Sequence, residues 1–365
     1  MKAQPYLGTF GRRIFSMVVV LGLSWFVGHP ARGQWSYFAG VFSAYDGNPF
    51  SLYQAPASGV WTLEAGVDYA GVRMGAGYVG DYIRYDHSST LDAYVHQVYL
   101  NVGDDTTSAG LWVEQRFSLE DKIYDYTGVS AALVHRFGCP GMICFGQADV
   151  QLYRFAVLKE RDRQAVKTLI RSVRSFPSGT TVIANLGAGY TRYAGDFSSY
   201  GQERAAVAQV SGGLRLAQAL TAVTGVAVYV QERRIGGETP EALVLEEDGV
   251  SYAVLDDPAL YGGRTFGVEI TQMLFDYALA LKAGASHVRR SYLTQGSYLD
   301  ATVYAVSVPR EDTYETVWLQ AEWDVRFGER GVALQLAAQW TDNRSSSFWY
   351  TYTDWYLSAG IRYHF

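Results

Sequence analysis

Apolar and polar residues alternate with a period of two over most of the chain. The clearest segments are 317–327, 332–341 and 355–365, where every second residue is apolar and the residues between them are mostly polar or charged. Successive side chains of a β-strand point to opposite faces, so this pattern predicts strands with one apolar and one polar face. A soluble sandwich also alternates, so alternation alone does not fix the fold.

The length of the predicted strands separates the two folds. They extend over about 10–12 residues, whereas strands of soluble sheets average ~5–6 and a tilted strand crossing a bilayer needs ~9–11. Short turns are predicted at one end of the strands, near 70–71, 103–108, 139–144, 177–179, 217–218, 275–276 and 328–329. Longer polar loops are predicted between them, at 86–90, 120–127, 159–164, 195–202, 232–263 and 292–312.

Seven short turns join eight hairpins and so predict 16 strands. The predicted fold is all-β: residues 34–365 form a single transmembrane, antiparallel, up-and-down β-barrel with short periplasmic turns and long extracellular loops. Counts of 14 or 18 strands are also compatible, because 59–85 has almost no break signal and 165–176 alternates poorly. An even number places both ends of the barrel in the periplasm.

Composition narrows the class further. Charged residues make up 18% of the chain, against ~25% in ordinary soluble domains, and hydrophobic residues 48%. A mean hydropathy of -0.05 and a single long apolar run exclude a helical membrane bundle. The net charge of -6 argues against a nucleic-acid partner. The abundant aromatic residues favour strands, and we expect interface girdles to include Trp35, Trp323, Trp340, Trp355, Tyr363 and Phe365.

The N-terminus has the pattern of a secretory signal peptide. Arg12 and Arg13 precede an apolar run over 14–27, and small residues follow near 31–33. We therefore expect residues 1–33 to be removed during export to a Gram-negative outer membrane. A retained membrane anchor is the alternative, although the run is short for a bilayer span.

The two cysteines lie close together around a Pro-Gly turn. Cys139 and Cys144 are five positions apart, and in an oxidising periplasm such a pair is expected to form a disulfide. The alternatives are two free thiols or half of a metal site. No histidine lies at ligand spacing, which disfavours a metal, and no cofactor is expected.

The last ten residues, Tyr-Leu-Ser-Ala-Gly-Ile-Arg-Tyr-His-Phe, resemble the C-terminal signal of bacterial outer-membrane β-barrel proteins, which include the porins. The resemblance rests on Tyr363 and Phe365 and implies recognition by the barrel-assembly machinery. The start of the predicted barrel, 35–50 with Asp46-Gly47-Asn48-Pro49, is similar to the barrels of surface-lipoprotein assembly modulators and of porin-like proteins linked to exopolysaccharide loci. An Asx-type turn explains residues 46–49 equally.

Placing the apolar face toward lipid assigns charged residues to the lumen. The acidic candidates are Glu64, Asp68, Glu114, Asp149, Glu269, Glu322 and Asp324, and the basic candidates are Arg73, Arg116, Arg215, Lys282, Arg326 and Arg362. This wall is nearly neutral, which argues against strong selectivity for one sign of charge. The alternative role of each residue is a cross-strand ion pair that fills the interior.

The predicted loop 232–263 is strongly acidic. It contains Glu238, Glu241, Glu246, Glu247, Asp248, Asp256 and Asp257. It could plug the lumen, bind divalent cations beside lipopolysaccharide, bind a partner, or simply be a solvated surface loop. Apolar runs at 242–245 and 250–255 predict a β-excursion within it.

The sequence indicates a transport protein and not an enzyme. The one local cluster that could suggest catalysis is Asp86-His87-Ser88-Ser89, but Ser and His residues that are adjacent in sequence do not by themselves make a dyad. We expect a pore for passive diffusion of small hydrophilic solutes. The alternative is a barrel that acts as a scaffold, or as an assembly or export partner, for another envelope protein. Outer-membrane lipid and lipopolysaccharide are the expected surroundings in either case.

Overall fold

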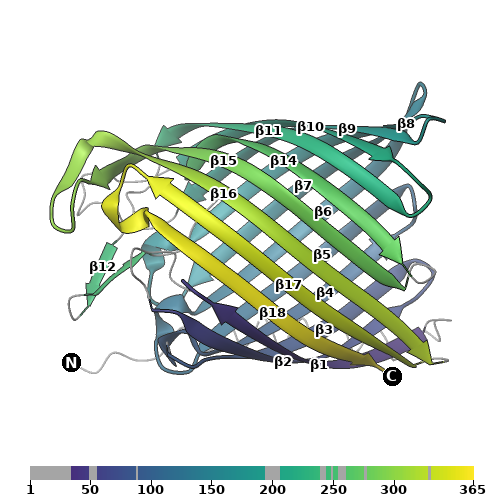
Figure 1. Ribbon diagram of the computed structural model, residues 1–365, viewed down its shortest axis with the longest axis horizontal. Helices are drawn as coiled ribbons and strands as arrows, with labels where there is room; N and C mark the ends of the chain where they lie inside the picture. Colours follow the sequence, from purple (N-terminus) through teal and green to yellow (C-terminus); the bar gives the residue numbers. More distant parts are fainter. Residues whose placement is uncertain are drawn as a thin grey trace.

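The computed structural model describes residues 34–48, 56–87, 89–193, 206–238, 244–247, 250–253, 260–274, 278–327 and 330–365. Within them the chain forms a closed antiparallel barrel of 16 strands that follow one another in sequence order (Figure 1). The predicted fold class and strand count are confirmed. The expected signal peptide, 1–33, lies outside the described residues. No helix in the described part of the chain is long and apolar enough to cross a membrane.

Each strand of the barrel pairs with its neighbours in sequence, and β1 closes the ring against β18. The strands are β1 (Gln34–Asp46), β2 (Ser58–Ala70), β3 (Met74–Tyr85), β4 (Ala93–Gly103), β5 (Thr107–Ser118), β6 (Tyr126–Cys139), β7 (Met142–Phe155), β8 (Arg163–Ser175), β9 (Thr180–Tyr193), β10 (Ala206–Ala219), β11 (Thr224–Glu238), β14 (Tyr261–Leu274), β15 (Leu279–Tyr298), β16 (Tyr304–Phe327), β17 (Arg330–Ser345) and β18 (Tyr352–His364).

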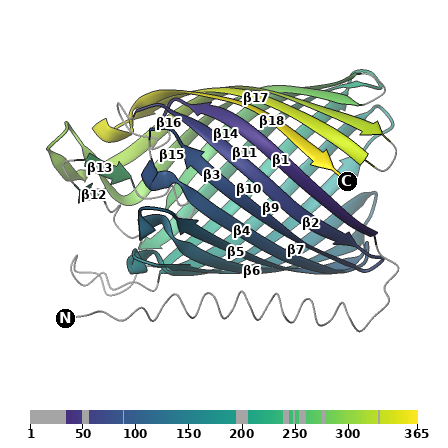
Figure 2. The same cartoon turned by 90° about the horizontal axis from the view of Figure 1, so that it is seen from below.

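Short elements lie at the end of the barrel opposite Gln34 and Phe365. The 3-10 turns η1 (Ser89–Leu91), η2 (Lys122–Tyr124), η3 (Lys159–Arg161) and η5 (Phe348–Tyr350) lie in the connections on that side. The strands β12 (Val244–Glu247) and β13 (Val250–Ala253) form a separate hairpin. Figure 2 shows this hairpin beside the extended ends of β15 and β16. The β-excursion expected in the acidic loop is therefore confirmed.

The two faces of the barrel wall differ in chemistry. Residues opposite each other in adjacent strands share a face, so the register extends each assignment around the ring. One face carries half-exposed aliphatic side chains, such as Leu63, Leu186, Val228, Val268 and Leu336. A continuous apolar surface of this extent is unfavourable in water and suits the acyl chains of a bilayer. The opposite face, which carries the charged side chains described below, is the inner one.

Aromatic residues gather at both borders of the apolar face. Near the termini, Trp35 packs on Tyr69 with ring centroids 5.0 Å apart, and Phe365 stacks on Tyr37 at 6.2 Å. Toward the other end, Trp340 lies directly opposite Trp355. Amphipathic rings favour the headgroup level of a bilayer, so the two borders mark the membrane interfaces.

The connections differ from the sequence prediction at three places. The turn expected at 217–218 lies at 220–223, because β10 continues to Ala219. The acidic loop is shorter than expected, since β11 extends to Glu238 and β14 begins at Tyr261. The prediction of a loop over 292–312 is wrong. β15 and β16 continue as a hairpin beyond the barrel, and only residues 299–303 connect them.

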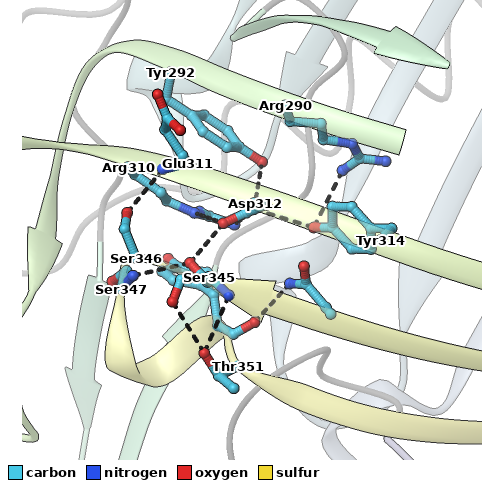
Figure 3. A network of polar contacts seen from close by, with 12 residues as sticks. Arg290, Tyr292, Arg310, Glu311, Asp312, Tyr314, Ser345, Ser346, Ser347 and Thr351 are labelled. Carbon is cyan, nitrogen blue, oxygen red and sulfur yellow. Dashed lines mark hydrogen bonds and ion pairs between the residues drawn. The ribbon is translucent and has the colours of Figure 1, made fainter. Parts of the chain in front are cut away.

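A buried polar network holds this hairpin extension (Figure 3). Asp312 is fully buried and accepts hydrogen bonds from Arg310 (2.6 Å), Tyr292 (3.1 Å) and Ser345 (2.6 Å). The guanidinium group of Arg310 also stacks over the Tyr350 ring, 3.3 Å from its centroid. The network ties β15, β16, β17 and η5 together. At the hairpin tip, the Thr302 and Val303 amides donate to Asp300 and lower the pKa of its carboxyl group.

Candidate functional site: the barrel lumen

The structure places most of the predicted lumen charges on the inner face. Glu64 and Arg362 lie on either side of Gly40, and Glu114 lies opposite Gln97. The same register assigns an inward position to Asp68, Arg116, Asp149, Arg215, Glu269, Lys282, Glu322 and Asp324. Two candidates differ. Arg73 belongs to the turn between β2 and β3, not to the wall, and the side chain of Arg326 lies outside the described residues.

Carboxylates dominate one arc of the lumen, on β2 to β5. Glu64 and Asp81 are directly opposite each other on β2 and β3. Glu114, on β5, accepts hydrogen bonds from Gln97 (2.6 Å) and Tyr126 (2.5 Å). Tyr99 donates to Asp68 at 2.5 Å. Tyrosine and amide donors therefore hold the carboxylates of Glu114 and Asp68 in fixed directions along this side of the wall.

Basic side chains dominate the arc formed by β8, β10 and β11. Arg163, Lys167 and Arg171 recur every fourth residue of β8 and so share its inner face. Lys167 donates to Gln151 at 3.1 Å, and Arg171 donates to Asn185 at 2.9 Å. Gln151 and Asn185 are neutral partners that orient the cations, and the carboxylate of Asp149 on β7 lies directly opposite Lys167.

Two ion pairs span the wall by reaching across an intervening strand. Arg362 of β18 contacts Glu64 of β2 at 2.7 Å, passing over β1 at Gly40. Arg215 of β10 contacts Glu269 of β14 at 2.5 Å, passing over β11. Cross-strand pairing was the alternative role that the sequence left open for these residues, and in these two pairs the structure shows it.

Apolar clusters line the inner wall toward the extracellular mouth. Tyr193, Val207 and Tyr292 occupy inward positions and form a buried cluster with Leu260. Leu260 immediately precedes β14, so the described end of the β11–β14 connection packs against the inner wall. A second cluster, Phe155 with Leu158, lies beside β6 and β7. The mouth is therefore narrowed by aromatic and aliphatic side chains on at least two sides.

Sequence analysis missed several inward charges, namely Asp81, Arg163, Lys167, Arg171, Arg233 and Arg290. Asp81 lies in the segment without break signals. Lys167 and Arg171 lie in the segment where alternation is poor, and Arg163 lies in the predicted loop 159–164. Leu169 and Val173 share the inner face of β8 while Thr168 and Ser172 face outward, so polarity does not reveal the parity of this strand. Arg233 and Arg290 fell within or next to segments expected to be loops.

The remaining candidates do not form a reactive centre among the described residues. No group of three or more His, Cys, Asp or Glu residues could hold a metal ion in the described part of the chain. The Ser89 hydroxyl donates to Glu120 at 2.8 Å and His96 pairs with Tyr78 at 2.8 Å. Cys139 and Cys144 are joined in a disulfide at the turn between β6 and β7, as predicted.

The acidic-loop candidates lie mostly outside the part of the chain that the structure describes. Glu241, Asp248, Asp256 and Asp257 lie outside the described residues. Glu246 and Glu247 belong to β12, and Glu238 ends β11, but the structure does not describe their side chains.

A closed antiparallel 16-strand barrel with an apolar exterior and a charged interior defines the class of bacterial outer-membrane β-barrels. Similar solved structures include OccAB1 of Acinetobacter baumannii, with a TM-score of 0.55, 8% identity and coverage of 91% of this chain and 98% of that chain. A bacterial polysaccharide outer membrane secretin has a TM-score of 0.53 and 7% identity, with coverage of 90% of this chain and 98% of that chain. OccAB2 of Acinetobacter baumannii has a TM-score of 0.52 and 9% identity, with coverage of 92% of this chain and 98% of that chain. At these identities the likeness concerns the fold alone. No protein-family model matches the sequence, and no curated protein matches it.

Proposed function

We propose that this protein is an outer-membrane pore for passive diffusion of small hydrophilic solutes. The observation that carries the proposal is the charged inner wall, with carboxylates on β2 to β5 and cations on β8 to β11. Charges of opposite sign on two arcs create a field across the lumen, which orients a polar solute and replaces part of its hydration. A 16-strand barrel is wide enough to hold water unless its loops fill it.

The similar folds support the same proposal. The folds of OccAB1 and OccAB2 are similar to this barrel over 98% of their own chains. The aliphatic outer face and the two aromatic borders fit a bilayer, and the predicted signal peptide fits export to the outer membrane. In this proposal the charged inner face of the barrel guides solutes by noncovalent contacts, and the protein catalyses no covalent reaction.

Single-channel recording in planar bilayers tests this function directly. We expect stepwise ion currents from the purified barrel. The variant Lys167→Glu/Arg171→Glu should shift the cation-to-anion permeability ratio toward cations by about two- to threefold, because a wall charge in water interacts with a passing ion by less than ~1 kcal/mol. The control Arg84→Glu/Arg344→Glu changes the total charge equally on the outer face and should leave the ratio unchanged.

Absence of current from a correctly folded barrel would contradict the pore. The alternative role, a scaffold or export partner, would then be supported by co-purification of a stoichiometric envelope protein. An equal shift in the control variant would show that the lumen charges on β8 do not face the ion path.

A further inference from the structure

The extracellular ends of β11, β14 and β15 form a notch in the outer face of the barrel. Pairing between β11 and β14 stops at Arg233 and Gly263, although β11 continues to Glu238 along β10 and β14 continues to Tyr261 along β15. Beyond those residues the two strands are no longer paired, although the backbone of β11 still lies close to Gly262. The cavity between them has a volume of about 460 Å³ and includes Gly262 and Gly263 in its lining.

Three arginines on outward positions border this notch. Arg264 lies directly opposite Arg289, and Arg234 lies one step further from the termini on β11. Their side chains are 79% (Arg234), 62% (Arg264) and 64% (Arg289) exposed. Like charges directly opposite each other in a sheet are destabilising, so the facing pair Arg264 and Arg289 favours an anion between them.

Two glutamates hold the arginines without saturating them. Glu232 accepts from Nε of Arg234 at 2.8 Å and contacts Nε of Arg264 at 3.4 Å, while Glu311 accepts from Arg289 at 2.7 Å. A guanidinium group has five N–H donors. Because Glu232 is reached through Nε, the terminal amino groups of Arg234 and Arg264 remain for a further acceptor as far as the described residues are concerned.

The position of the notch matches the headgroup level of the outer leaflet. The outward row immediately below Glu232, Arg264 and Arg289 consists of Val230, Phe266 and His287. Phe266 is 51% exposed and Val268, one row lower, is 53% exposed. A ligand that joins a phosphate to acyl chains would place the phosphate at the arginines and its chains along Val230, Phe266 and Val268, while His287 of the upper row faces Glu315 at 3.7 Å.

We propose that Arg234, Arg264 and Arg289 bind a phosphate group of a glycolipid of the outer leaflet, the lipid A part of lipopolysaccharide. This inference rests on the outer-membrane location that the proposed function includes, but not on transport. Other outward arginines at the same end, Arg84, Arg154, Arg192 and Arg344, lie singly on β3, β7, β9 and β17, so among the described residues this clustering of guanidinium groups occurs only at the notch.

The test is lipid binding by native mass spectrometry of the full-length protein purified in detergent. Bis-phosphorylated lipid A should bind with one copy held preferentially, and Arg234→Gln/Arg264→Gln/Arg289→Gln should weaken that binding at least about tenfold. The matched control Arg84→Gln/Arg154→Gln/Arg344→Gln removes the same charge from scattered positions and should bind like the unmodified protein. Heat-modifiable gel migration establishes that every variant is folded.

Two further probes identify the ligand chemistry. Lipid A stripped of both phosphates should bind at least about tenfold more weakly to the unmodified barrel, and inorganic phosphate should compete only at millimolar concentration. Equal binding by both triple variants, equal binding of the phosphate-free lipid, or inorganic phosphate binding as tightly as lipid A would each overturn the proposal. Channel recordings of the notch variant remain unchanged if it folds, so this result is independent of the pore.

Discussion

At the scale of single residues, the same charged side chains have different roles according to their burial. Asp312 and Arg310 are buried, with 0% and 8% of their side chains exposed, and they form an ion pair in which each neutralises the charge of the other. Their neighbour Glu311 is 49% exposed and pairs with Arg289 at the surface. Breaking a buried ion pair leaves an uncompensated charge, whereas breaking a surface pair costs little.

We therefore expect Asp312→Ala to loosen the hairpin extension of β15 and β16. The substitution leaves the Arg310 guanidinium group buried without its carboxylate, at a cost of about 3–5 kcal/mol. Amide hydrogen exchange in 292–312 should accelerate at least roughly 100-fold, while the barrel strands keep their protection. Glu311→Ala, one position away, should change exchange by less than about fivefold. Similar rates in both variants would contradict the structural role of the network.

At the scale of elements, the strands followed from the sequence wherever one face is apolar and the other polar. Segments 317–327, 332–341 and 355–365 became β16, β17 and β18 with the expected parity. The extension 292–312 could not be predicted, because its stability depends on the Asp312 network, whose partners come from β15, β16 and β17. Contacts between residues far apart in sequence leave no periodic signal.

In the lumen, too, the sequence predicts which face of a strand a residue lies on, but not which residues of other strands it contacts. Parity along one strand placed Glu64, Glu114 and Arg215 on the inner face. It could not show that Arg362 reaches Glu64 across β1, because this contact requires the ring to close. It also could not assign β8, where Leu169 and Val173 face inward and Thr168 and Ser172 face outward.

The turn between β6 and β7 gives a prediction at the same scale. Gly141 has φ of +68°, a conformation that glycine adopts without strain, and Cys139 is joined to Cys144 beside it. The register between β6 and β7 runs from Cys139 and Met142 to Tyr126 and Phe155. Because this ladder positions the turn without the disulfide, Cys139→Ser/Cys144→Ser should still assemble, with a loss of about 2 kcal/mol. Folded and unfolded gel bands measured against temperature check this, and failure to assemble would contradict it.

At the scale of the whole molecule, the barrel exists only if its first and last strands meet. β1 and β18 are paired from Phe38 and His364 to Asp46 and Tyr356. Two backbone hydrogen bonds between Tyr37 and Phe365 extend this seam, at 3.0 and 3.2 Å. The Phe42 ring lies against Gly360, where any side chain would clash with it. No chain connection joins the two strands directly, so side chains that bridge the seam contribute to closure itself.

The ion pair between Arg362 and Glu64 is such a bridge, and the pair between Arg215 and Glu269 is its natural control. Both pairs reach across one strand on the inner face, at 2.7 and 2.5 Å, and both are partly exposed. The first joins β18 to β2 across the seam, whereas the second joins β10 to β14, in the middle of the sheet. Glu64→Gln should lower the temperature at which the compact gel form is lost by several degrees, and Glu269→Gln by less than half as much. The difference arises because a weakened seam lets the whole ring open, while neighbouring ladders hold β10, β11 and β14 together. Equal shifts in the two single variants would show that the seam has no special dependence on this pair. If the double variant Glu64→Gln/Arg362→Gln regains the lost stability, the loss in Glu64→Gln comes from leaving the Arg362 guanidinium group unpaired.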